Sequence, residues 1–234
     1  RLQGSLIGDA LIKGSLQAPE VKATVNGQKL AYDTVSINSL IADVDWQTTR
    51  DNSNNIEIQA QGLTLDNDFL SQLDLSWQGN LDQHSLRAQW QDQRQNNLNL
   101  GCTGSFTQPG TTTNLNHWQG HCRQLAATLA HPSGLPQWQL ADKIEVRGDN
   151  YTQWQLSPWC LEEQSTKAQL CSRNTITVKG SEVETARIEA SAWPLAWLEP
   201  WLPNKLQVSG NADIGLDATS KVDPNSGNLG CRAD

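Results

Sequence analysis

Residues 72–78 read Q-L-D-L-S-W-Q, and residues 55–61 read N-I-E-I-Q-A-Q. In both stretches every second residue is apolar, and the residues between them are polar or charged. Because successive side chains of a β-strand point to opposite faces, this alternation indicates strands with one dry face and one wet face. The same pattern, cut by Gly, Asn, Asp and Pro, recurs along the chain, for example in residues 206–217. The sequence therefore predicts an all-β protein.

A hairpin that turns at Leu81 and Asp82 would join two of these apolar runs. The residues that would then lie opposite one another are Trp77 and Leu86, Leu75 and Ala88, and Leu73 and Trp90. Cross-strand pairs of aromatic and aliphatic side chains stabilise a sheet by roughly 0.2–1 kcal/mol each. We therefore predict that these six side chains share one face of the sheet.

Composition excludes several classes of protein. The chain has 234 residues, a length that suits one β domain or two, and a formal net charge of −8. Phosphate binding needs clustered Lys and Arg, which the sequence lacks, so no nucleic-acid partner is expected. It has no apolar run of about 18 residues that would span a membrane, and no signal peptide. We interpret residues 1–234 as one repetitive β segment of a longer protein.

The cysteines fit a pattern of hairpins. Pairing the runs on either side of Thr112 places Cys102 opposite Cys122, and a turn at residues 163–167 places Cys160 opposite Cys171. Directly opposed strand positions suit a disulfide, and each bridge would contribute on the order of 3 kcal/mol. Bridges favour an oxidising compartment, which is the periplasm for a bacterial chain. The alternative is unpaired, buried thiols in a cytosolic protein; Cys231 is left without a partner.

One segment departs from the strand pattern. Residues 191–203 carry Trp193, Trp197 and Trp201 at a spacing of four, and Pro194 suits the first turn of a helix. Pro200 and Pro203 exclude a long helix. We predict one to two turns of amphipathic helix whose Trp and Leu side chains lie on the sheet. The alternative is a contact with a membrane or a partner.

No residue pattern indicates a metal, a cofactor or an enzyme. His117, His121 and Cys122 are residue types that bind metals, but in a strand the two histidines would be about 13 Å apart. Cys122 also has a better partner in Cys102. The sequence has no nucleophile elbow and no phosphate loop. We therefore expect no catalytic residues, no metal ligands and no cofactor.

Several motifs resemble one known family. Residues 13–20 (K-G-S-L-Q-A-P-E) are similar to the recurring Gly-Ser-Leu-x-Ala-Pro strand opener of the translocation and assembly module subunit (TamB) family, an AsmA-like, bridge-like lipid transfer group. Residues 159–161 (W-C-L) and 168–171 (A-Q-L-C) resemble its paired-cysteine hairpin. As in that family, a short segment rich in Leu, Pro and aromatic residues (195–203) and a Ser-Gly strand opener (206–213) follow.

The resemblance implies an elongated sheet, curved like a taco shell around a hydrophobic groove. It also implies a long periplasmic protein that is anchored in the bacterial inner membrane by segments outside these residues. The family is linked to outer-membrane and autotransporter assembly with an Omp85-type, TamA-like partner, and to carrying phospholipids between the two membranes. The expected partners are therefore phospholipid acyl chains and, through other regions, an outer-membrane protein.

A groove of this kind would bury acyl chains, and each buried methylene is favourable by about 0.8 kcal/mol. The candidates for its lining are the apolar-face residues of the predicted strands, namely Ile56, Ile58, Leu73, Leu75, Trp77, Leu86, Trp90, Leu98, Leu100, Trp154, Leu156, Leu206, Val208, Ile214 and Leu216.

The alternation also fits a closed β-sandwich, which would bury the same residues as a core. A further alternative is a secreted carbohydrate-binding sandwich that uses Trp side chains as stacking platforms. Stacking platforms would lie on the wet face or in loops, whereas Trp46, Trp77, Trp90 and Trp154 are in phase with the apolar face. Their phase favours a lipid-compatible interior.

Overall fold

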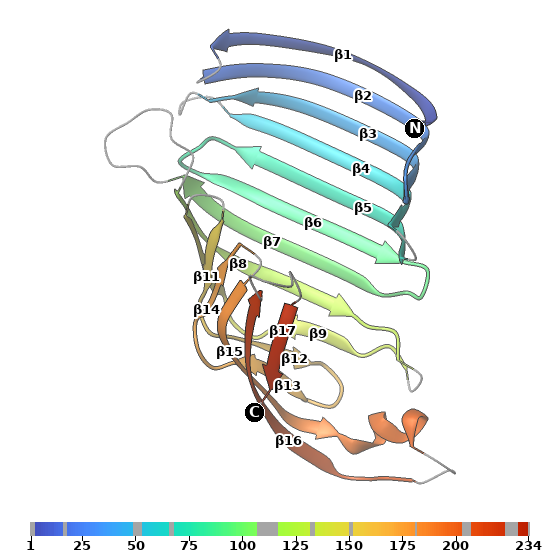
Figure 1. The fold of residues 1–234 in the computed structure, drawn as a ribbon, viewed down its shortest axis with the longest axis vertical. Helices are drawn as coiled ribbons and strands as arrows, with labels where there is room; N and C mark the ends of the chain where they lie inside the picture. The colour runs from blue at the N-terminus through green and yellow to red at the C-terminus, as the bar shows by residue number, and fades with distance from the viewer. Residues whose placement is uncertain are drawn as a thin grey trace. The chain divides into compact units, whose positions relative to one another are not determined.

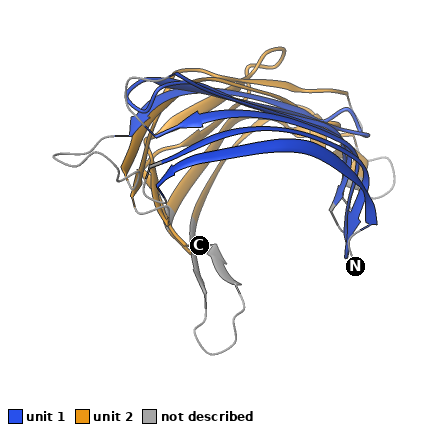
Figure 2. Ribbon diagram, turned by 90° about the horizontal axis from the view of Figure 1, so that it is seen from above, with its two compact units in different colours: residues 1–115 blue, residues 116–234 orange. Residues whose placement is uncertain are grey.

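The protein is all-β (Figure 1). The computed structural model describes residues 3–15, 18–48, 53–65, 68–106, 117–131, 134–149, 152–180, 182–202, 207–222 and 229–233. Its 17 strands make up an antiparallel sheet, which confirms the fold class predicted from the alternation of apolar residues. The chain divides into two compact units, Arg1–Leu115 and Asn116–Asp234, which Figure 2 colours blue and orange. Each unit is described by itself below.

Unit 1 is a meander in which each strand pairs with the next one along the chain. Its strands are β1 (Gln3–Ser15), β2 (Ala18–Tyr32), β3 (Val35–Gln47), β4 (Asn54–Leu65), β5 (Asp68–Gly79), β6 (His84–Asp92) and β7 (Asn97–Phe106). The strands curve along their length, as the blue ribbon in Figure 2 shows. The register between β5 and β6 confirms the predicted hairpin, with the pairs Leu73–Trp90, Leu75–Ala88 and Trp77–Leu86.

A line of backbone irregularities crosses the first strands of unit 1. Gly4, Lys29 and Gly62 have positive φ angles of 102°, 51° and 63°. Lys29 stands between the pairs Gln28–Ser39 and Leu30–Ile37, at the level of Asn38 on β3. Such irregularities bend a strand and increase its local twist. Because they lie side by side on neighbouring strands, they bend the sheet along one line.

The apolar pattern changes phase at this bend. On one side of it the facing residues are Gly27, Leu40, Ala60 and Leu73, and on the other side they are Leu30, Ile37, Leu63 and Leu70. On each strand the apolar positions flanking the bend are three residues apart instead of two.

The apolar side chains lie on the inside of the bend. A Cβ added to Gly27 would lie 2.6 Å from Leu30 Cδ1, which shows that Leu30 leans over Gly27 from the far side. Ala60 and Leu63, on either side of Gly62, are only 4% and 9% exposed. The bend therefore curves the sheet toward its apolar face.

Unit 2 contains two long strands, β8 and β15, whose halves pair with different short strands. Its elements are β8 (His117–Thr128), β9 (Gln137–Leu140), β10 (Ile144–Asp149), β11 (Gln153–Leu156), β12 (Trp159–Glu163), β13 (Gln169–Ser172), β14 (Ile176–Lys179), β15 (Glu182–Pro194), the 3₁₀ helix η1 (Leu195–Trp201), β16 (Asn211–Val222) and β17 (Leu229–Ala233). One half of β8 pairs with β10, which continues to β11 and β14. The other half pairs with β9, which continues to β12 and β13. Both series end on β15, and β16 and β17 follow.

The short strands are halves of long strands that are kinked in the middle. Five residue steps separate Gln139 from Ile144, whereas their partners Ala126 and Cys122 lie four steps apart. Likewise, four residue steps separate Ser172 on β13 from Ile176 on β14, whereas their partners Trp159 and Leu156 lie three steps apart. These extra residues act as bulges, and they bend unit 2 along a line of its own.

The predicted short helix is present, with different bounds and a different type. Residues 191–194 continue β15, and η1 begins after Pro194, which has an extended conformation with φ −66° and ψ 120°. Pro200 lies inside η1, which helps to explain a 3₁₀ helix of 7 residues rather than an α-helix. None of the described helices is long and apolar enough to cross a membrane.

Four cysteines of the described residues are disulfide-bonded. Cys160 pairs with Cys171 between β12 and β13, and the two form a disulfide. Cys102 and Cys122 are both disulfide-bonded. Their pairing with each other stays a prediction, and the turn of the predicted hairpin lies within residues 107–116, outside the described residues. Disulfides indicate an oxidising compartment. The side chain of Cys231 is also outside the described set, and the grouping of residues 1–234 as one β-groove segment stays a prediction.

Candidate functional site

The largest candidate site in unit 1 is its apolar face. Three lines of directly paired residues cross the strands on this face. The first line is the pair Val21 and Trp46 on β2 and β3. The second line crosses β2 to β7 through Ala23, Val44, Ile56, Trp77, Leu86 and Cys102. The third line crosses the same strands through Val25, Ala42, Ile58, Leu75, Ala88 and Leu100. A fourth line runs from Leu40 through Ala60, Leu73 and Trp90 to Leu98. The face is therefore continuous from β2 to β7.

This apolar face is open rather than covered. Leu75, in the middle of the face, is 38% exposed, and Ile12 on β1, which pairs with Val21, is 71% exposed. Most other apolar residues of the face are half-buried rather than buried. The described strands of unit 1 form a single layer, so no second sheet of that unit covers these side chains. A closed sandwich within unit 1 is thus excluded for the described residues.

The opposite face of unit 1 is polar. A hollow of about 360 Å³ on this face is lined mainly by Glu57, Gln59, Gln61, Gln72, Asp74, Ser76, Arg87 and Gln89. These residues alternate along the strands with the apolar ones, for example Ser76 between Leu75 and Trp77. The separation of polar and apolar residues between the two faces is the one that the sequence pattern predicts.

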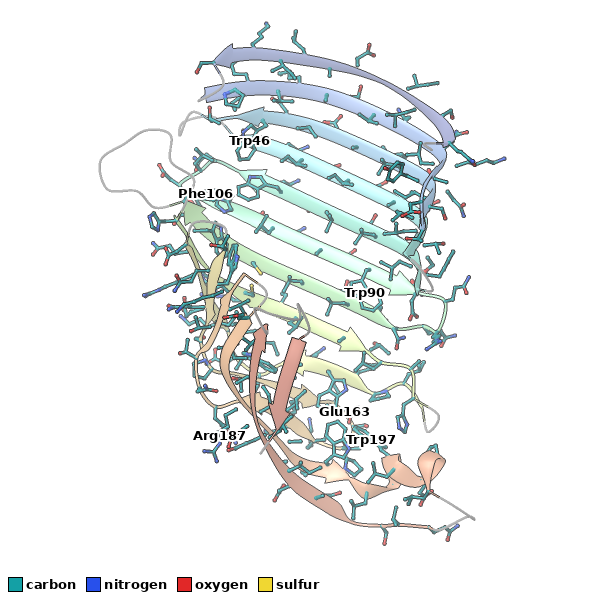
Figure 3. The ribbon with its side chains drawn as sticks, viewed as in Figure 1. Trp46, Trp90, Phe106, Glu163, Arg187 and Trp197 are labelled. Atoms are coloured by element: carbon teal, nitrogen blue, oxygen red, sulfur yellow. A yellow bond between two sulfur atoms is a disulfide. The ribbon has the colours of Figure 1, made fainter. Side chains whose placement is uncertain are left out.

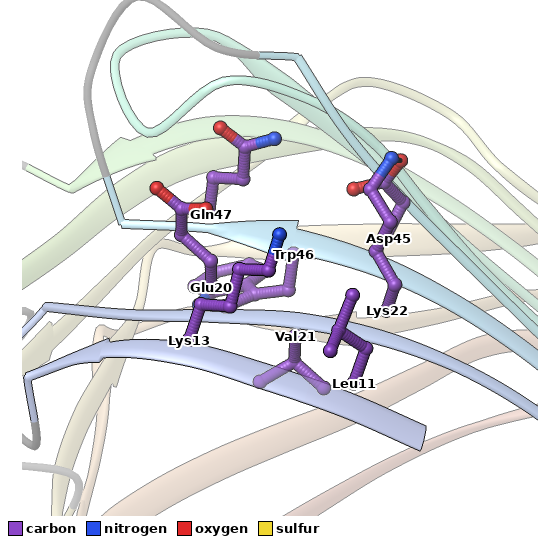
Figure 4. Close-up of a pocket in the computed structure, with 8 residues that line it drawn as sticks. All are labelled: Leu11, Lys13, Glu20, Val21, Lys22, Asp45, Trp46 and Gln47. Carbon is purple, nitrogen blue, oxygen red and sulfur yellow. Dashed lines mark ion pairs between the residues drawn. The ribbon is translucent and has the colours of Figure 1, made fainter. Parts of the chain in front are cut away.

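A smaller pocket of about 100 Å³ lies across β1, β2 and β3. Figure 4 shows its lining, which consists of Leu11, Lys13, Glu20, Val21, Lys22, Asp45, Trp46 and Gln47. Lys22 Nζ lies 2.9 Å from Asp45 Oδ2, and this hydrogen bond raises the pKa of Lys22. Both side chains of the pair are well exposed. The pocket holds no group whose surroundings suggest catalysis.

Aromatic rings gather at one edge of the apolar face of unit 1, where strands begin or end. The ring of Trp77 stacks on His84 at 3.9 Å, stacks on Phe106 at 5.7 Å, and meets Trp46 edge-on at 5.7 Å. Figure 3 shows Trp46 and Phe106 near this edge and Trp90 closer to the opposite one. Burial lowers the pKa of His84, although its hydrogen bond with the Asn80 carbonyl acts in the opposite direction. We call Trp46, Trp77, His84 and Phe106 the aromatic edge.

Unit 2 has an apolar face with two parts, one on either side of its kinks. On one side the paired residues are Trp118, Gly148, Trp154 and Val178, and the Trp154 ring lies over Gly148. On the other side the paired residues are Leu140, Leu161, Leu170, Ala190 and Ile214. Ile214 is 53% exposed, so this face is also open at β16.

Three tryptophans form a cluster on the apolar face of unit 2. Trp138, Trp193 and Trp197 have ring centroids 5.1–6.1 Å apart, and His131 lies 6.0 Å from Trp197. The helix η1 therefore lies on the sheet through Trp197, as the sequence predicts, whereas Leu198, also predicted to lie on the sheet, is 41% exposed. The side chain of Trp201 is outside the described residues.

Glu163 is a buried carboxylate beside this cluster, since it pairs with Trp138 across β12 and β9. It is only 2% exposed. Burial alone would raise its pKa, but hydrogen bonds from Thr166, Ser165 and the Gln137 amide outweigh burial and lower the pKa to about 2. These bonds close the β12–β13 turn, so Glu163 has a structural role.

The structure places most of the predicted groove residues on these apolar faces. Ile56, Ile58, Leu73, Leu75, Trp77, Leu86, Trp90, Leu98 and Leu100 share the face of unit 1. Trp154, Leu156, Ile214 and Leu216 belong to unit 2, where Leu216 pairs with Ile188. Val208 lies outside the strands, with its amide donating to Glu199, and Leu206 is outside the described residues. Whether these residues bind lipid stays a prediction.

Sequence reasoning missed several residues of the apolar faces. His84, Asn54 and Glu163 are polar residues that occupy apolar-face positions next to turns. Phe106, at the end of β7, is a further residue of the aromatic edge that the sequence pattern did not indicate. The phase of Asn54 with Ile56 and Ile58 was a signal that could have placed its side chain on this face.

The histidines considered for a metal site lie on β8. His117 Nδ1 is 2.5 Å from Asp149 Oδ1, and His121 pairs with Glu145 across the strands. Cys122 is disulfide-bonded. Among the described residues, no group of three or more His, Cys, Asp and Glu side chains is placed to hold a metal ion.

Comparison with known proteins identifies the family. The model of the family described as TamB, N-terminal domain, matches residues 1–228. No solved structure matches the chain. The family match covers nearly the whole chain. The chain therefore belongs to the TamB family.

Proposed function

We propose that this chain shields lipid acyl chains along its apolar faces, as part of a periplasmic protein anchored in the inner membrane. In this role the protein transports phospholipid toward the outer membrane and supports outer-membrane protein assembly with an Omp85-type partner. Family membership and the disulfides support a role in the cell envelope. The proposal requires no cofactor and no catalytic residue.

One observation carries the proposal: the apolar face of unit 1 is continuous across six strands and remains open. A folded protein rarely exposes a contiguous apolar surface unless that surface contacts a partner, a ligand or a membrane. Leu75 at the centre of the face is 38% exposed, while its neighbour Ser76 lies on the polar face. An acyl chain placed on this surface would remove both its own methylenes and the protein side chains from water.

The shape of the face suits a mobile ligand. Its residues are mostly Leu, Ile, Val, Ala and Trp, repeated at equivalent positions on successive strands. Hydrophobic attraction is non-directional and roughly proportional to the area buried. A chain that moves from one strand to the next therefore exchanges similar contacts and meets no deep local minimum.

Site-specific photocrosslinking in cells tests the proposal. A photoreactive residue is placed at Leu75, Leu100 or Ile214, and adducts are analysed by mass spectrometry for covalently attached phospholipid. Matched controls carry the same residue at Gln89 and Asp217, which are exposed and lie on the polar faces.

Phospholipid adducts at the three apolar positions, and none at the two polar positions, are the expected result. An absence of lipid at Leu75, Leu100 and Ile214 in folded protein would contradict the proposal. Equal labelling at apolar and polar positions would also contradict it, because nonspecific contact with a membrane does not distinguish the two faces.

A further inference from the structure

Two buried N–H groups on the apolar face of unit 1 have no hydrogen-bond acceptor. They are Asn54 Nδ2 and Trp77 Nε1. Asn54 is 1% exposed and begins β4, two residues before Ile56, which pairs with Trp77. Because residues two apart on a strand share a face, both side chains lie on the same face and at the same edge of the sheet. That edge is the aromatic edge.

Contacts within the protein leave hydrogen-bond donors of Asn54 and Trp77 unused. Asn54 Oδ1 accepts a hydrogen bond from the Gln47 amide at 2.5 Å, which fixes the orientation of the side-chain amide and leaves its NH₂ group unused. The Trp77 ring stacks on His84, but stacking uses its face and not its N–H. Leaving a buried donor without an acceptor costs roughly 1–3 kcal/mol. Two such donors at one place call for a ligand that supplies acceptors.

We propose that Asn54 and Trp77 form a polar anchor, which donates hydrogen bonds to oxygen atoms of a glycerophospholipid whose acyl chains lie on the apolar face. This inference rests on the function proposed above and specifies how one lipid is held. The lipid has oxygen acceptors of two kinds close to its chains: ester carbonyls and phosphate oxygens. Both can accept hydrogen bonds from the unused N–H groups of Asn54 and Trp77.

The position of the anchor suits a lipid that enters at the sheet edge. Strand β4 runs from the aromatic edge toward the bend at Gly62. Acyl chains that start at Asn54 would therefore follow Ile56, Ile58 and Ala60 along this strand. From Asn54 to Leu63 the strand extends over roughly 30 Å at 3.4 Å per residue. The polar part of the lipid would remain at the edge, close to water.

Both nitrogens are buried in the structure. A lipid oxygen can therefore reach them only if a neighbouring side chain moves. Trp46 is the candidate, because it meets Trp77 edge-on and ends the apolar line on β3. Its displacement would exchange a contact between two rings for two hydrogen bonds and the contacts of an acyl chain. The anchor is therefore closed without lipid and open with it.

Lipid-binding measurements on the purified protein test the anchor. Asn54→Asp keeps the oxygen that accepts from Gln47 and removes the NH₂ donor, and Trp77→Phe removes the indole N–H. The matched control is Asn99→Asp, which makes the same change at an exposed position on the polar face, opposite Gln89. The probe is a fluorescent dioleoyl phosphatidylethanolamine, compared with its diether analogue, which lacks the ester carbonyls.

We expect the double variant Asn54→Asp, Trp77→Phe to bind the diester lipid roughly tenfold or more weakly than the wild type. Asn99→Asp should change binding less than threefold. If wild-type protein binds the diether as weakly as the variant binds the diester, the ester carbonyls are the acceptors. If the wild type binds both lipids equally and the double variant binds both more weakly, the phosphate is the acceptor.

The indole ¹⁵N–¹H resonance of Trp77, assigned by its loss in Trp77→Phe, gives a second readout. It should move downfield when lipid is added, because a hydrogen bond deshields the proton. A folded double variant that binds lipid as tightly as the wild type, with an unmoved Trp77 resonance in the wild type, would overturn the anchor while leaving the proposed function intact. Wild-type protein that binds neither lipid would instead overturn the proposed function, and the anchor with it.

Discussion

Glu163 shows how a carboxylate can remain ionised on an otherwise apolar face. Its oxygens accept hydrogen bonds from Thr166 N at 2.6 Å, Thr166 Oγ1 at 2.7 Å and Ser165 N at 2.9 Å. A charge buried without such donors would be strongly unfavourable. The bonds make the charge part of the β12–β13 turn, beside the Cys160–Cys171 disulfide.

Replacing Glu163 with Gln should destabilise the protein in a pH-dependent way. Because the folded-state pKa of about 2 lies below the value of an unfolded Glu, near 4.5, the ionised group adds stability that is fully present above pH 4.5. At neutral pH we expect Glu163→Gln to lower the free energy of unfolding by roughly 3 kcal/mol. The difference should shrink as the pH falls from 4.5 toward 2.

Urea unfolding followed by circular dichroism between pH 2 and pH 7 measures this difference. Glu57→Gln, at an exposed position on the polar face of unit 1, is the control and should change stability little. A constant difference between Glu163→Gln and the wild type over the whole range would contradict the assigned role of the charge.

At the scale of the elements, the bend in unit 1 depends on residues that tolerate a left-handed backbone. Gly62 has φ +63°, and an added Cβ would overlap the side chain of Asn38 on β3. Gly62→Ala should therefore reduce the free energy of unfolding by roughly 1–3 kcal/mol. Thermal unfolding would show the loss as a lower Tm.

A double variant separates the two causes of this loss. Asn38→Ala removes the atoms closest to the new Cβ, so Gly62→Ala with Asn38→Ala should lose less stability than the two single losses added together. Strictly additive losses would mean that backbone strain alone accounts for the effect. A Gly62→Ala variant as stable as the wild type would refute the assigned role of Gly62.

The disulfide between β12 and β13 makes a second prediction at this scale. The bridge joins residues 11 apart in the sequence. A loop of this length corresponds to roughly 3 kcal/mol of stabilisation in the chain-entropy description. Cys160→Ser with Cys171→Ser should unfold at a lower urea concentration than the oxidised wild type. The variant lacks this bridge with or without a reducing agent, so the reducing agent should lower the stability of the wild type more than that of the variant.

At the scale of the whole molecule, the division between a polar and an apolar face is what the proposed function uses. Leu75→Arg places a charge in the middle of the open apolar face, where an acyl chain would have to desolvate it. We expect this variant to fold and to lose most of its lipid crosslinking at Leu100. The matched variant Gln89→Arg places the same charge on the polar face and should keep the lipid crosslinking at Leu100.

Cells that express each variant in place of the wild-type protein provide the measurement. Leu100 crosslinking to phospholipid is compared between the two variants at equal protein levels. Undiminished crosslinking in a folded Leu75→Arg protein would contradict a lipid path over this face.

Local patterns in the sequence were sufficient for much of this fold. Alternation placed Leu73, Leu75 and Trp77 on one face and predicted the register with β6, because side-chain direction along a strand has a period of two. Opposed positions likewise predicted the Cys160–Cys171 bridge. The short segment near Pro194 was recognisable as helix because prolines and the tryptophan spacing act locally.

The sequence by itself thus determined that this is a strand-built protein with one apolar and one polar face. Only the tertiary structure decided where the sheet bends, which apolar residues stay exposed, and that Asn54, Trp77 and His84 meet at one edge. These features depend on how irregular residues such as Gly4, Lys29 and Gly62 align across neighbouring strands. Alignment between strands is a non-local property, and the period of a single strand does not encode it.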